Sequence, residues 1–207
     1  MATPTLRDRL IEAAVGLTTT AGWAKVTMAR LADEVGVSRQ TVYNEIGTKG
    51  DLAEAMVLRE LDRFLAGVTR SFDENPDDLI SAIRDSARRV LKYAEDNALL
   101  HAVVSATHGA DTELLPLLTT HADHLLDGAK LVVADRVAAY DVNLEPDRLE
   151  ASIDMVVRLV LSHVMQPSAA PARTADDIAW IAEHVLRSDP TDPNVAQQVG
   201  SAGFDRG

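Results

Sequence analysis

The chain has 207 residues, a formal net charge of −12 and a hydrophobic content of 46%, so a core can form and intrinsic disorder is not expected. It contains no cysteine, which excludes a disulfide framework and a thiolate metal site. No apolar run approaches about 18 residues, and the N-terminus lacks a signal-peptide profile. We therefore expect a cytoplasmic protein that does not cross a membrane.

The negative charge is unevenly distributed along the chain. Residues 1–60 carry 7 Lys and Arg against 8 Asp and Glu, a net charge of −1, whereas residues 61–207 carry 13 against 24, a net charge of −11. The first part leaves Arg7, Arg30, Arg39 and Lys49 available for phosphates. Its weak field predicts modest affinity for non-specific DNA and a shallow salt dependence.

The first predicted helix begins at Thr3-Pro4, where a capping residue precedes a proline at the first helical position. It ends near Gly22, and its apolar stripe consists of Leu6, Leu10, Ala14 and Leu17. Trp23 follows the glycine turn, and we expect it to be a buried packing residue.

The next predicted helix is short and ends in a tight turn. Thr27 is a suitable N-cap, and Gly36 stands where a left-handed C-terminal residue is wanted. The apolar face of this helix consists of Met28, Leu31, Ala32 and Val35.

A second short helix follows, with Ser38 as its N-cap. Val42 and Ile46 share its inner face, and Gln40, Tyr43 and Asn44 share an outer one. The two helices together are typical of a helix-turn-helix, whose second helix enters the major groove of DNA.

The first 55 residues or so resemble the DNA-binding domain of the tetracycline-repressor (TetR) family of bacterial transcriptional regulators. The residues that carry the resemblance are Ala21-Gly22-Trp23, Thr27-Met28, Leu31-Ala32, Val35-Gly36-Val37-Ser38, Thr41-Val42-Tyr43, Lys49 and Leu52. Glu45 and Ile46 depart from the family, which commonly has a histidine-phenylalanine pair there. Ile46 can fill the same apolar position, and we expect Glu45 to point away from the DNA backbone or to contact a base.

The outer face of the second short helix supplies the candidates for DNA binding. Gln40 and Asn44 can each pair with an adenine edge, and Arg39 can reach a guanine or a phosphate. The other candidates, mainly for phosphate contacts, are Thr27, Ser38, Thr41, Tyr43 and Lys49.

The rest of the chain predicts further helices and no strand. A capping box at Thr48 and Asp51 opens a helix to about residue 74, roughly 40 Å long. Later helices are expected at 79–96, 99–107, 112–140, 149–164 and, capped by Thr174, 174–186. The prediction is an all-α fold of about nine helices. We divide it into a DNA-binding domain (1–47), a ligand-binding and dimerisation domain (48–188) and a flexible tail (189–207).

The resemblance implies an effector cavity in the second domain. The candidate lining residues, which can equally be ordinary core, are Tyr93, Leu99, His101, Val104, His108, Leu114, Leu118 and Leu125. Aliphatic walls with a few polar groups suit a mostly apolar small molecule.

The resemblance also implies a two-fold dimer through a four-helix bundle, built from two C-terminal helices per subunit. The apolar stripe of the helix at 149–164 is wider than packing against one neighbouring helix requires. The candidate interface residues are Ile153, Val156, Val157, Val160, Leu161, Val164, Ile178, Ile181 and Val185.

A metal site is the alternative use of the histidines. His101 and His108 are two turns apart, and His121 and His124 flank Asp123. Such residues can bind zinc, but no second carboxylate ligand is evident, so we predict neither a metal nor a cofactor. Catalytic motifs are also absent, which argues against an enzyme.

We interpret the sequence as a homodimeric, ligand-responsive repressor that binds a palindromic operator and is released by a small hydrophobic effector. An effector would tilt the long fourth helix and change the separation of the two DNA readers. The alternatives are an activator or ligand-independent regulator of the same family, and a metal-dependent protein that uses the histidines.

Overall fold

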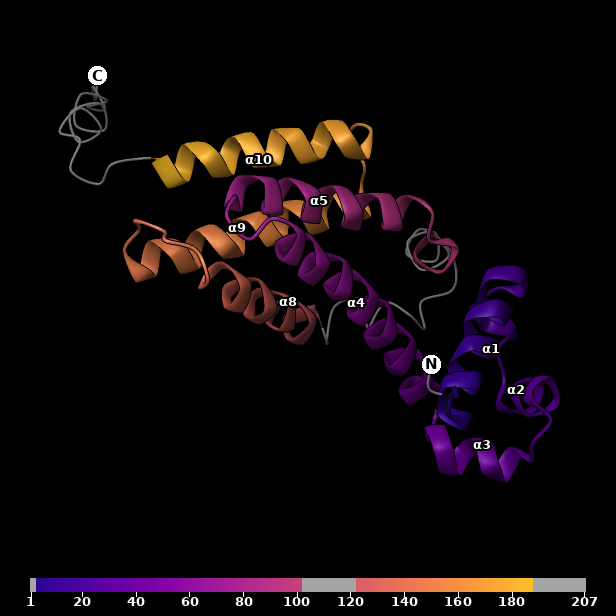
Figure 1. The fold of residues 1–207 in the computed structure, drawn as a ribbon. Coiled ribbons are helices and arrows are strands. Elements are labelled where there is room, and N and C mark those ends of the chain that lie inside the picture. Colours follow the sequence, from indigo (N-terminus) through magenta and orange to yellow (C-terminus); the bar gives the residue numbers. More distant parts are fainter. Residues whose placement is uncertain (1–2, 102–121, 188–207) are drawn as a thin grey trace, which may run out of the picture.

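The computed structural model describes residues 3–101 and 122–187, and this part of the chain is helical without a strand (Figure 1). The prediction of an all-α fold is therefore confirmed. The elements are α1 (Leu6–Ala21), the 3-10 helix η1 (Trp23–Lys25), α2 (Met28–Val35), α3 (Arg39–Ile46), α4 (Lys49–Glu74), α5 (Leu79–Glu95), α8 (Ala122–Val137), α9 (Pro146–Met165) and α10 (Pro171–Arg187). No helix in these two ranges is long and apolar enough to cross a membrane.

The helices α1, α2 and α3 form a small N-terminal unit around its own core. Leu10, Leu31 and Val42 are fully buried there, one from each helix. Leu52 and Met56 of α4 belong to the same core, which fixes the start of α4 to the unit. The predicted domain boundary at residue 47 coincides with the α3–α4 junction but stays a prediction.

The long helix α4 connects this unit to the helical body formed by α5, α8, α9 and α10 (Figure 1). Its 26 residues span about 39 Å at 1.5 Å per residue. In the body, α5 lies between α4 and α10 and also contacts α9, while α8 packs against α4 and α9. A rigid element thus runs from the helix-turn-helix into the body.

Two predicted helix caps are wrong. The N-cap of α1 is Thr5, because its side chain accepts a hydrogen bond from the Asp8 N–H at 3.1 Å, so Thr3-Pro4 lies before the helix. The last helix begins at Pro171, which suits a first turn that needs no N–H donor. Thr174 is therefore a buried residue within α10 and does not cap it.

Several predicted segments lie partly or wholly outside the described residues. Of the helix predicted at 99–107, the structure describes a helical start at residues 98–101. Of the helix predicted at 112–140, it describes α8, which ends at Val137. The predicted tail from residue 189 lies outside.

Capping boxes start both α1 and α4, and each contains a carboxyl group whose pKa is lowered. Hydrogen bonds from the Thr5 hydroxyl and N–H hold the pKa of Asp8 below its ordinary value, and those from the Thr48 N–H and hydroxyl do the same for Asp51. Since each carboxyl has a lowered pKa in the folded state, its stabilisation is present above about pH 3.9 and is lost as the pH falls through the lowered pKa.

We predict that the double variant Asp8→Asn/Asp51→Asn will have a lower Tm than the unaltered protein at pH 7. It should also lose less Tm between about pH 5 and pH 2, because the contributions of these two carboxylates are absent at every pH. Asp62→Asn, which changes an exposed carboxylate of α4, serves as the control and should keep the original profile. Parallel Tm curves for the double variant and the unaltered protein would contradict the prediction.

Candidate functional site

The exposed face of α3 presents a pair of amide side chains that are bonded to each other. Gln40 Nε2 donates to Asn44 Oδ1 at 2.8 Å, one helical turn away. The bond uses one donor of Gln40 and the acceptor of Asn44, so the Gln40 oxygen and the Asn44 NH2 group keep hydrogen-bonding capacity. An acceptor and a donor side by side match the major-groove edge of adenine. Arg39 and Tyr43 are also exposed on α3.

The remaining DNA candidates stand at helix starts. Thr27 accepts from the Arg30 N–H at 3.2 Å and caps α2, while Ser38 accepts from the Thr41 N–H at 3.0 Å and caps α3. The hydroxyls of Ser38 and Thr41 also contact each other at 2.8 Å. Both caps agree with the sequence prediction, and each stands at the partially positive end of a short helix.

Lys49, the first residue of α4, has its ammonium 4.8 Å from the centroid of the Trp23 ring. Trp23 itself is buried, which confirms its prediction as a packing residue. The cation–π contact keeps the Lys49 charge close to the N-terminal unit.

Three arginines of the N-terminal unit bind backbone carbonyls. Arg7 donates to the Glu45 carbonyl at 2.8 Å, and Arg9 donates to the Val35 carbonyl at 3.0 Å, so α1 secures the last turns of α3 and α2. Arg30 donates to the Lys25 carbonyl at 3.0 Å. Arg7 and Arg30 were expected from the sequence to be available for phosphates. Their contacts with backbone carbonyls were not predicted.

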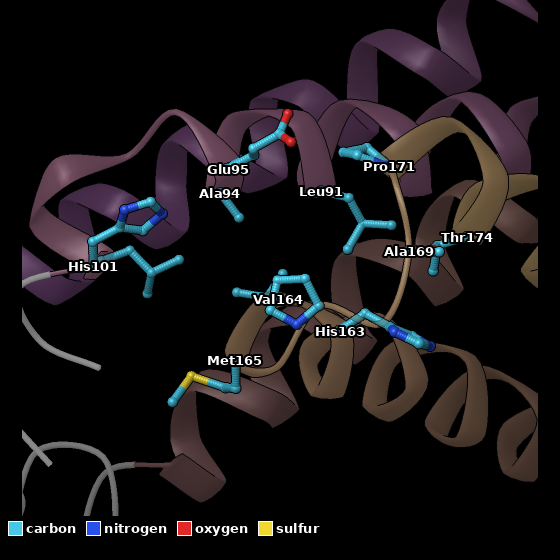
Figure 2. A pocket seen from close by; sticks show the side chains of 12 residues that line it. Leu91, Ala94, Glu95, His101, His163, Val164, Met165, Ala169, Pro171 and Thr174 are labelled. Atoms are coloured by element: carbon cyan, nitrogen blue, oxygen red, sulfur yellow. The ribbon is translucent and has the colours of Figure 1, made fainter. Parts of the chain in front are cut away.

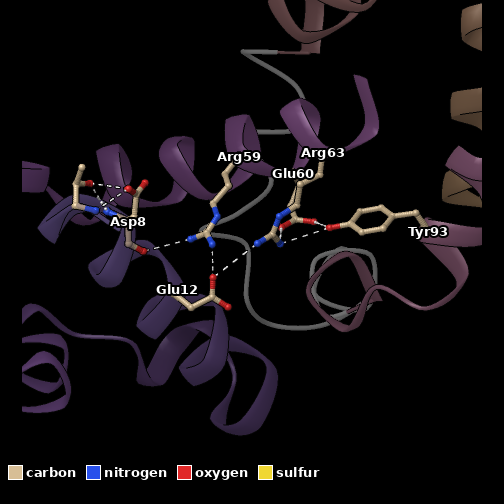
Figure 3. A network of polar contacts seen from close by, with 7 residues as sticks. Asp8, Glu12, Arg59, Glu60, Arg63 and Tyr93 are labelled. Carbon is tan, nitrogen blue, oxygen red and sulfur yellow. Dashed lines mark hydrogen bonds and ion pairs between the residues drawn. The ribbon is translucent and has the colours of Figure 1, made fainter. Parts of the chain in front are cut away.

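A buried carboxylate, Glu60 of α4, joins α4 to the end of α5 (Figure 3). It accepts hydrogen bonds from the Tyr93 hydroxyl at 2.7 Å and from Asn97 Nδ2 at 2.5 Å, and it pairs with Arg63 Nη1 at 2.8 Å. Burial and the bond to Glu60 raise the pKa of Tyr93, so its hydroxyl remains a donor at neutral pH.

The network continues from α4 into α1 (Figure 3). Glu12 of α1 pairs with Arg59 and lies 3.7 Å from Arg63 Nη2, and Arg59 also donates to the Asp8 carbonyl at 3.2 Å. A chain of charged groups therefore connects the end of α5, through α4, to the first helix of the helix-turn-helix unit. The sequence shows Glu60 and Arg63 at helical i, i+3 spacing but not their long-range partners.

The residues after α5 touch the N-terminal core and a cavity at once. Asn97 Oδ1 accepts from the Leu100 N–H at 2.9 Å, which caps the helical turn at 98–101. Leu99 is buried in the core cluster of α1, α2 and α3. Leu100 and His101 line a cavity in the body.

That cavity, which we call the polar cavity, has a volume of about 270 Å³ and lies between the end of α5, the end of α9 and the loop before α10 (Figure 2). Its lining combines aliphatic groups with two imidazoles and a carboxylate: Leu91, Ala94, Glu95, Leu100, His101, His163, Val164, Met165, Pro167, Ala169, Pro171 and Thr174.

A second cavity, which we call the apolar cavity, has a volume of about 110 Å³. It lies between α4, α5, α8 and α9 and shares Val164 with the polar cavity. Its lining residues are Leu61, Phe64, Leu65, Val68, Phe72, Ile83, Ser86, Ala87, Val90, Val133, Val156, Val157, Val160, Leu161 and Val164.

The residues that were predicted to line one effector cavity do not all lie around the same cavity. His101 lines the polar cavity, Tyr93 belongs to the Glu60 network, and Leu99 packs in the N-terminal core. The structure does not describe Val104, His108, Leu114 and Leu118, nor the side chain of Leu125. The aliphatic residues of α4 and α9 that line the apolar cavity were not predicted from the sequence as ligand residues, because their spacing is that of any core helix.

The histidine cluster falls largely outside the described ranges, which include neither His108 and His121 nor the side chain of His124. Among the described residues, no group of three or more His, Asp or Glu side chains could hold a metal ion.

Two family models match the chain. The model of the tetR family of bacterial regulatory proteins matches residues 10–56, and the model of the bacterial tetracyclin repressor C-terminal domain matches residues 78–184. The chain belongs to the TetR family. It is a DNA-binding, ligand-responsive transcriptional regulator and not an enzyme.

Known regulators are similar to the chain over most of its length. The transcriptional regulator AlkX of Mycobacterium tuberculosis is 31% identical over 174 residues, which cover 84% of this chain and 82% of AlkX. The solved repressor AlkX of Dietzia superposes with a TM-score of 0.70 at 23% identity, covering 89% of this chain and 97% of its own. The fatty acid degradation regulator FadR of Bacillus halodurans gives a TM-score of 0.55 at 16% identity, covering 91% and 100%.

The TetR-family body exposes apolar side chains on α9 and α10. Of the predicted interface residues, Leu161 is 40% exposed, Ile181 42% and Val185 39%, and Trp180, which was not predicted, is 60% exposed. The Trp180 ring lies 4.2 Å from that of His184, between centroids. A partner chain can cover this face.

The other predicted interface residues lie inward within one chain. Ile153, Val157 and Ile178 are buried there, and Val156, Val160 and Val164 are half-buried against the clusters of the body. The wide stripe of α9 is therefore largely occupied by contacts within the subunit.

We predict that Glu60→Gln will destabilise this TetR-family regulator by about 1–3 kcal/mol, because the buried donors Tyr93 and Asn97 lose a charged acceptor. A double-mutant cycle with Tyr93→Phe should show coupling of at least about 0.5 kcal/mol. The control Asp96→Asn breaks only the exposed pair with Lys92 and should cost less than about 1 kcal/mol. Equal costs for Glu60→Gln and Asp96→Asn in urea unfolding would contradict the prediction.

Proposed function

We propose that the protein is a homodimeric repressor in the bacterial cytoplasm. In this proposal α3 of each subunit reads one half of a palindromic operator, and a small hydrophobic effector in the body releases the dimer. The observation that carries the proposal is the exposed Gln40–Asn44 pair on α3, which offers a base edge one acceptor and one donor. Two-fold symmetry of the dimer matches the palindrome, with half-sites about 34–36 Å apart.

The proposed phosphate contacts come from the groups around this pair. Thr27, Ser38 and Thr41 stand at or near the starts of α2 and α3, and Lys49 starts α4. Tyr43 is exposed further along α3. Such contacts position a protein on DNA without reading sequence. Arg39 is exposed at the start of α3 and, in this proposal, contacts a guanine or a phosphate.

The proposed release uses the contacts between the body and the N-terminal unit. An effector in the polar cavity touches Leu100 and His101, which share one helical turn with Leu99 in the N-terminal core. Asn97 in turn holds Glu60 of α4. Because these contacts are tight, a shift of this turn moves α4 and α1, which favours dimers that no longer fit the operator.

The proposed dimer interface is the exposed face of α9 and α10, with Trp180 as its central aromatic residue. Tryptophan is enriched in interfaces, and an apolar patch of this kind on a subunit marks an interaction site. The second subunit places the same patch against it, as two-fold symmetry requires.

We predict that Trp180→Glu/Ile181→Glu will sediment as a folded monomer at micromolar concentration, whereas the unaltered protein sediments as a dimer. Both side chains are exposed in one chain, so the substitutions add charge at the interface without entering the core. The control Leu131→Glu changes a residue of α8 that is 71% exposed and should leave a dimer. A monomeric unaltered protein, or dimers for all three, would refute this interface.

We predict that Gln40→Ala and Asn44→Ala will each cost about 1–3 kcal/mol at one base pair and relax the sequence preference there. Because the two side chains are bonded to each other, the double variant should lose less than the sum of the single variants. The measurement is affinity for an operator selected from random-sequence DNA, against its single-base variants. An equal loss of affinity for the operator and all its single-base variants would contradict the proposed docking of α3 in the major groove.

We predict that Lys49→Ala will weaken binding to all DNA sequences alike and make the salt slope shallower by about one unit. Lys49→Arg keeps the charge beside Trp23 and is the control, which should keep the slope. A change in base preference in Lys49→Ala would contradict a phosphate contact.

A further inference from the structure

The last turns of α2 and α3 contain no basic residue of their own. The final carbonyls of a helix lack partners within it and carry a partial negative charge, so a cation close to them is stabilising. The start of α1 supplies the cation in both cases. Arg7 Nη1 donates to the Glu45 carbonyl of α3 at 2.8 Å, and Arg9 Nη2 donates to the Val35 carbonyl of α2 at 3.0 Å.

The bond from Arg7 restrains α3 in a way that packing does not. Val42 and Ile46 hold the inner face of α3 against the core of the N-terminal unit. Apolar packing is non-directional, so it fixes the depth of the helix more firmly than its tilt. A charge-assisted hydrogen bond is directional and about twice as strong as a neutral one, and here it holds the end of the helix.

Helix α4 binds the same end of α1 (Figure 3). Arg59 Nη1 donates to the Asp8 carbonyl at 3.2 Å, and Arg59 also pairs with Glu12 further along α1. Arg7, Asp8 and Glu12 all lie in the first two turns of α1. The start of α1 is thus bound both to α4 and to the end of α3, so the bond from Arg7 helps to set the orientation of α3 relative to α4.

We propose that Arg7 is a positioning residue for sequence discrimination, because its bond to the Glu45 carbonyl sets the tilt at which α3 presents Gln40 and Asn44 to the bases. This inference rests on the proposed function, in which α3 reads the operator. Pairing with a base edge needs correctly aligned bonds, whereas attraction to phosphates carries no sequence information. A tilted α3 therefore loses discrimination between sequences before it loses attraction to DNA.

This role differs from the phosphate contact for which the sequence makes Arg7 available, and the two roles have different salt dependences. Losing a phosphate contact weakens binding to all sequences alike and makes the salt slope shallower by about one unit. Losing a positioning bond leaves the number of phosphate contacts unchanged. The salt slope then stays the same, and the ratio of operator affinity to non-operator affinity falls.

The test measures this affinity ratio for the full chain, well below its Tm and at several salt concentrations. The two probes are an operator selected from random-sequence DNA and a scrambled duplex of the same length. We expect Arg7→Gln to lower the ratio about three- to tenfold, part of the discrimination that a base contact supplies, without a change of salt slope. Arg7→Lys keeps a charged donor for the carbonyl and should restore most of the ratio.

The matched control is Arg9→Gln, which removes the same charge from the start of α1 but breaks a bond to α2. It should lower the ratio less than Arg7→Gln does. Arg7→Met, which keeps much of the alkyl chain without a donor, should behave as Arg7→Gln and covers the case in which that variant does not fold. Without DNA, amide hydrogen exchange in the last turn of α3 should be faster in Arg7→Gln than in the unaltered protein.

An unchanged affinity ratio in Arg7→Gln and Arg7→Met would overturn the inference. So would a uniform loss of affinity with a salt slope shallower by about one unit, or unchanged hydrogen exchange in α3. A protein that selects no DNA sequence would refute the proposed function together with this inference, whereas an operator that is bound with an unchanged ratio refutes the inference alone.

Discussion

The buried carboxylate of Glu60 is the constraint on which the connection between the two parts of the chain depends. A charge removed from water must keep its partners, because breaking any of its bonds leaves a buried charge under-satisfied. Tyr93 and Asn97 come from α5 and the turn after it, and Arg63 comes from α4. The end of α5 and the middle of α4 therefore move together or incur an electrostatic penalty.

Local signals in the sequence were sufficient to predict the helix-turn-helix. The caps Thr27 and Ser38 and the capping box at Thr48 are short-range features, and all three are found where they were predicted. The start of the last helix was misplaced because Thr174 and Asp177 have the same spacing as a cap. The helix begins at Pro171. A proline can mark the first turn of a helix, but the prolines and alanines at 167–173 are also typical of a loop.

Long-range contacts could not be predicted from one sequence. Leu99 looks like any apolar helical residue, and only the path of the chain places it in the core of the N-terminal unit. The same holds for Arg7, whose bond to the Glu45 carbonyl spans 38 positions in the sequence. On α10, Ile178 and Ile181 are both apolar, but one is 1% exposed and the other 42%. A stripe of apolar residues does not tell which side faces the body.

The use of Arg7, Arg9 and Arg30 as backbone donors has a consequence for how the regulator finds its site on a chromosome. An N-terminal part with a net charge of −1, whose arginines are partly engaged inside the unit, has little attraction for the DNA backbone away from its operator. Sliding along non-operator DNA should then be brief, and most encounters should start from free solution. Fewer copies are held on irrelevant sequence, so a small number of copies of the regulator per cell can keep its site occupied.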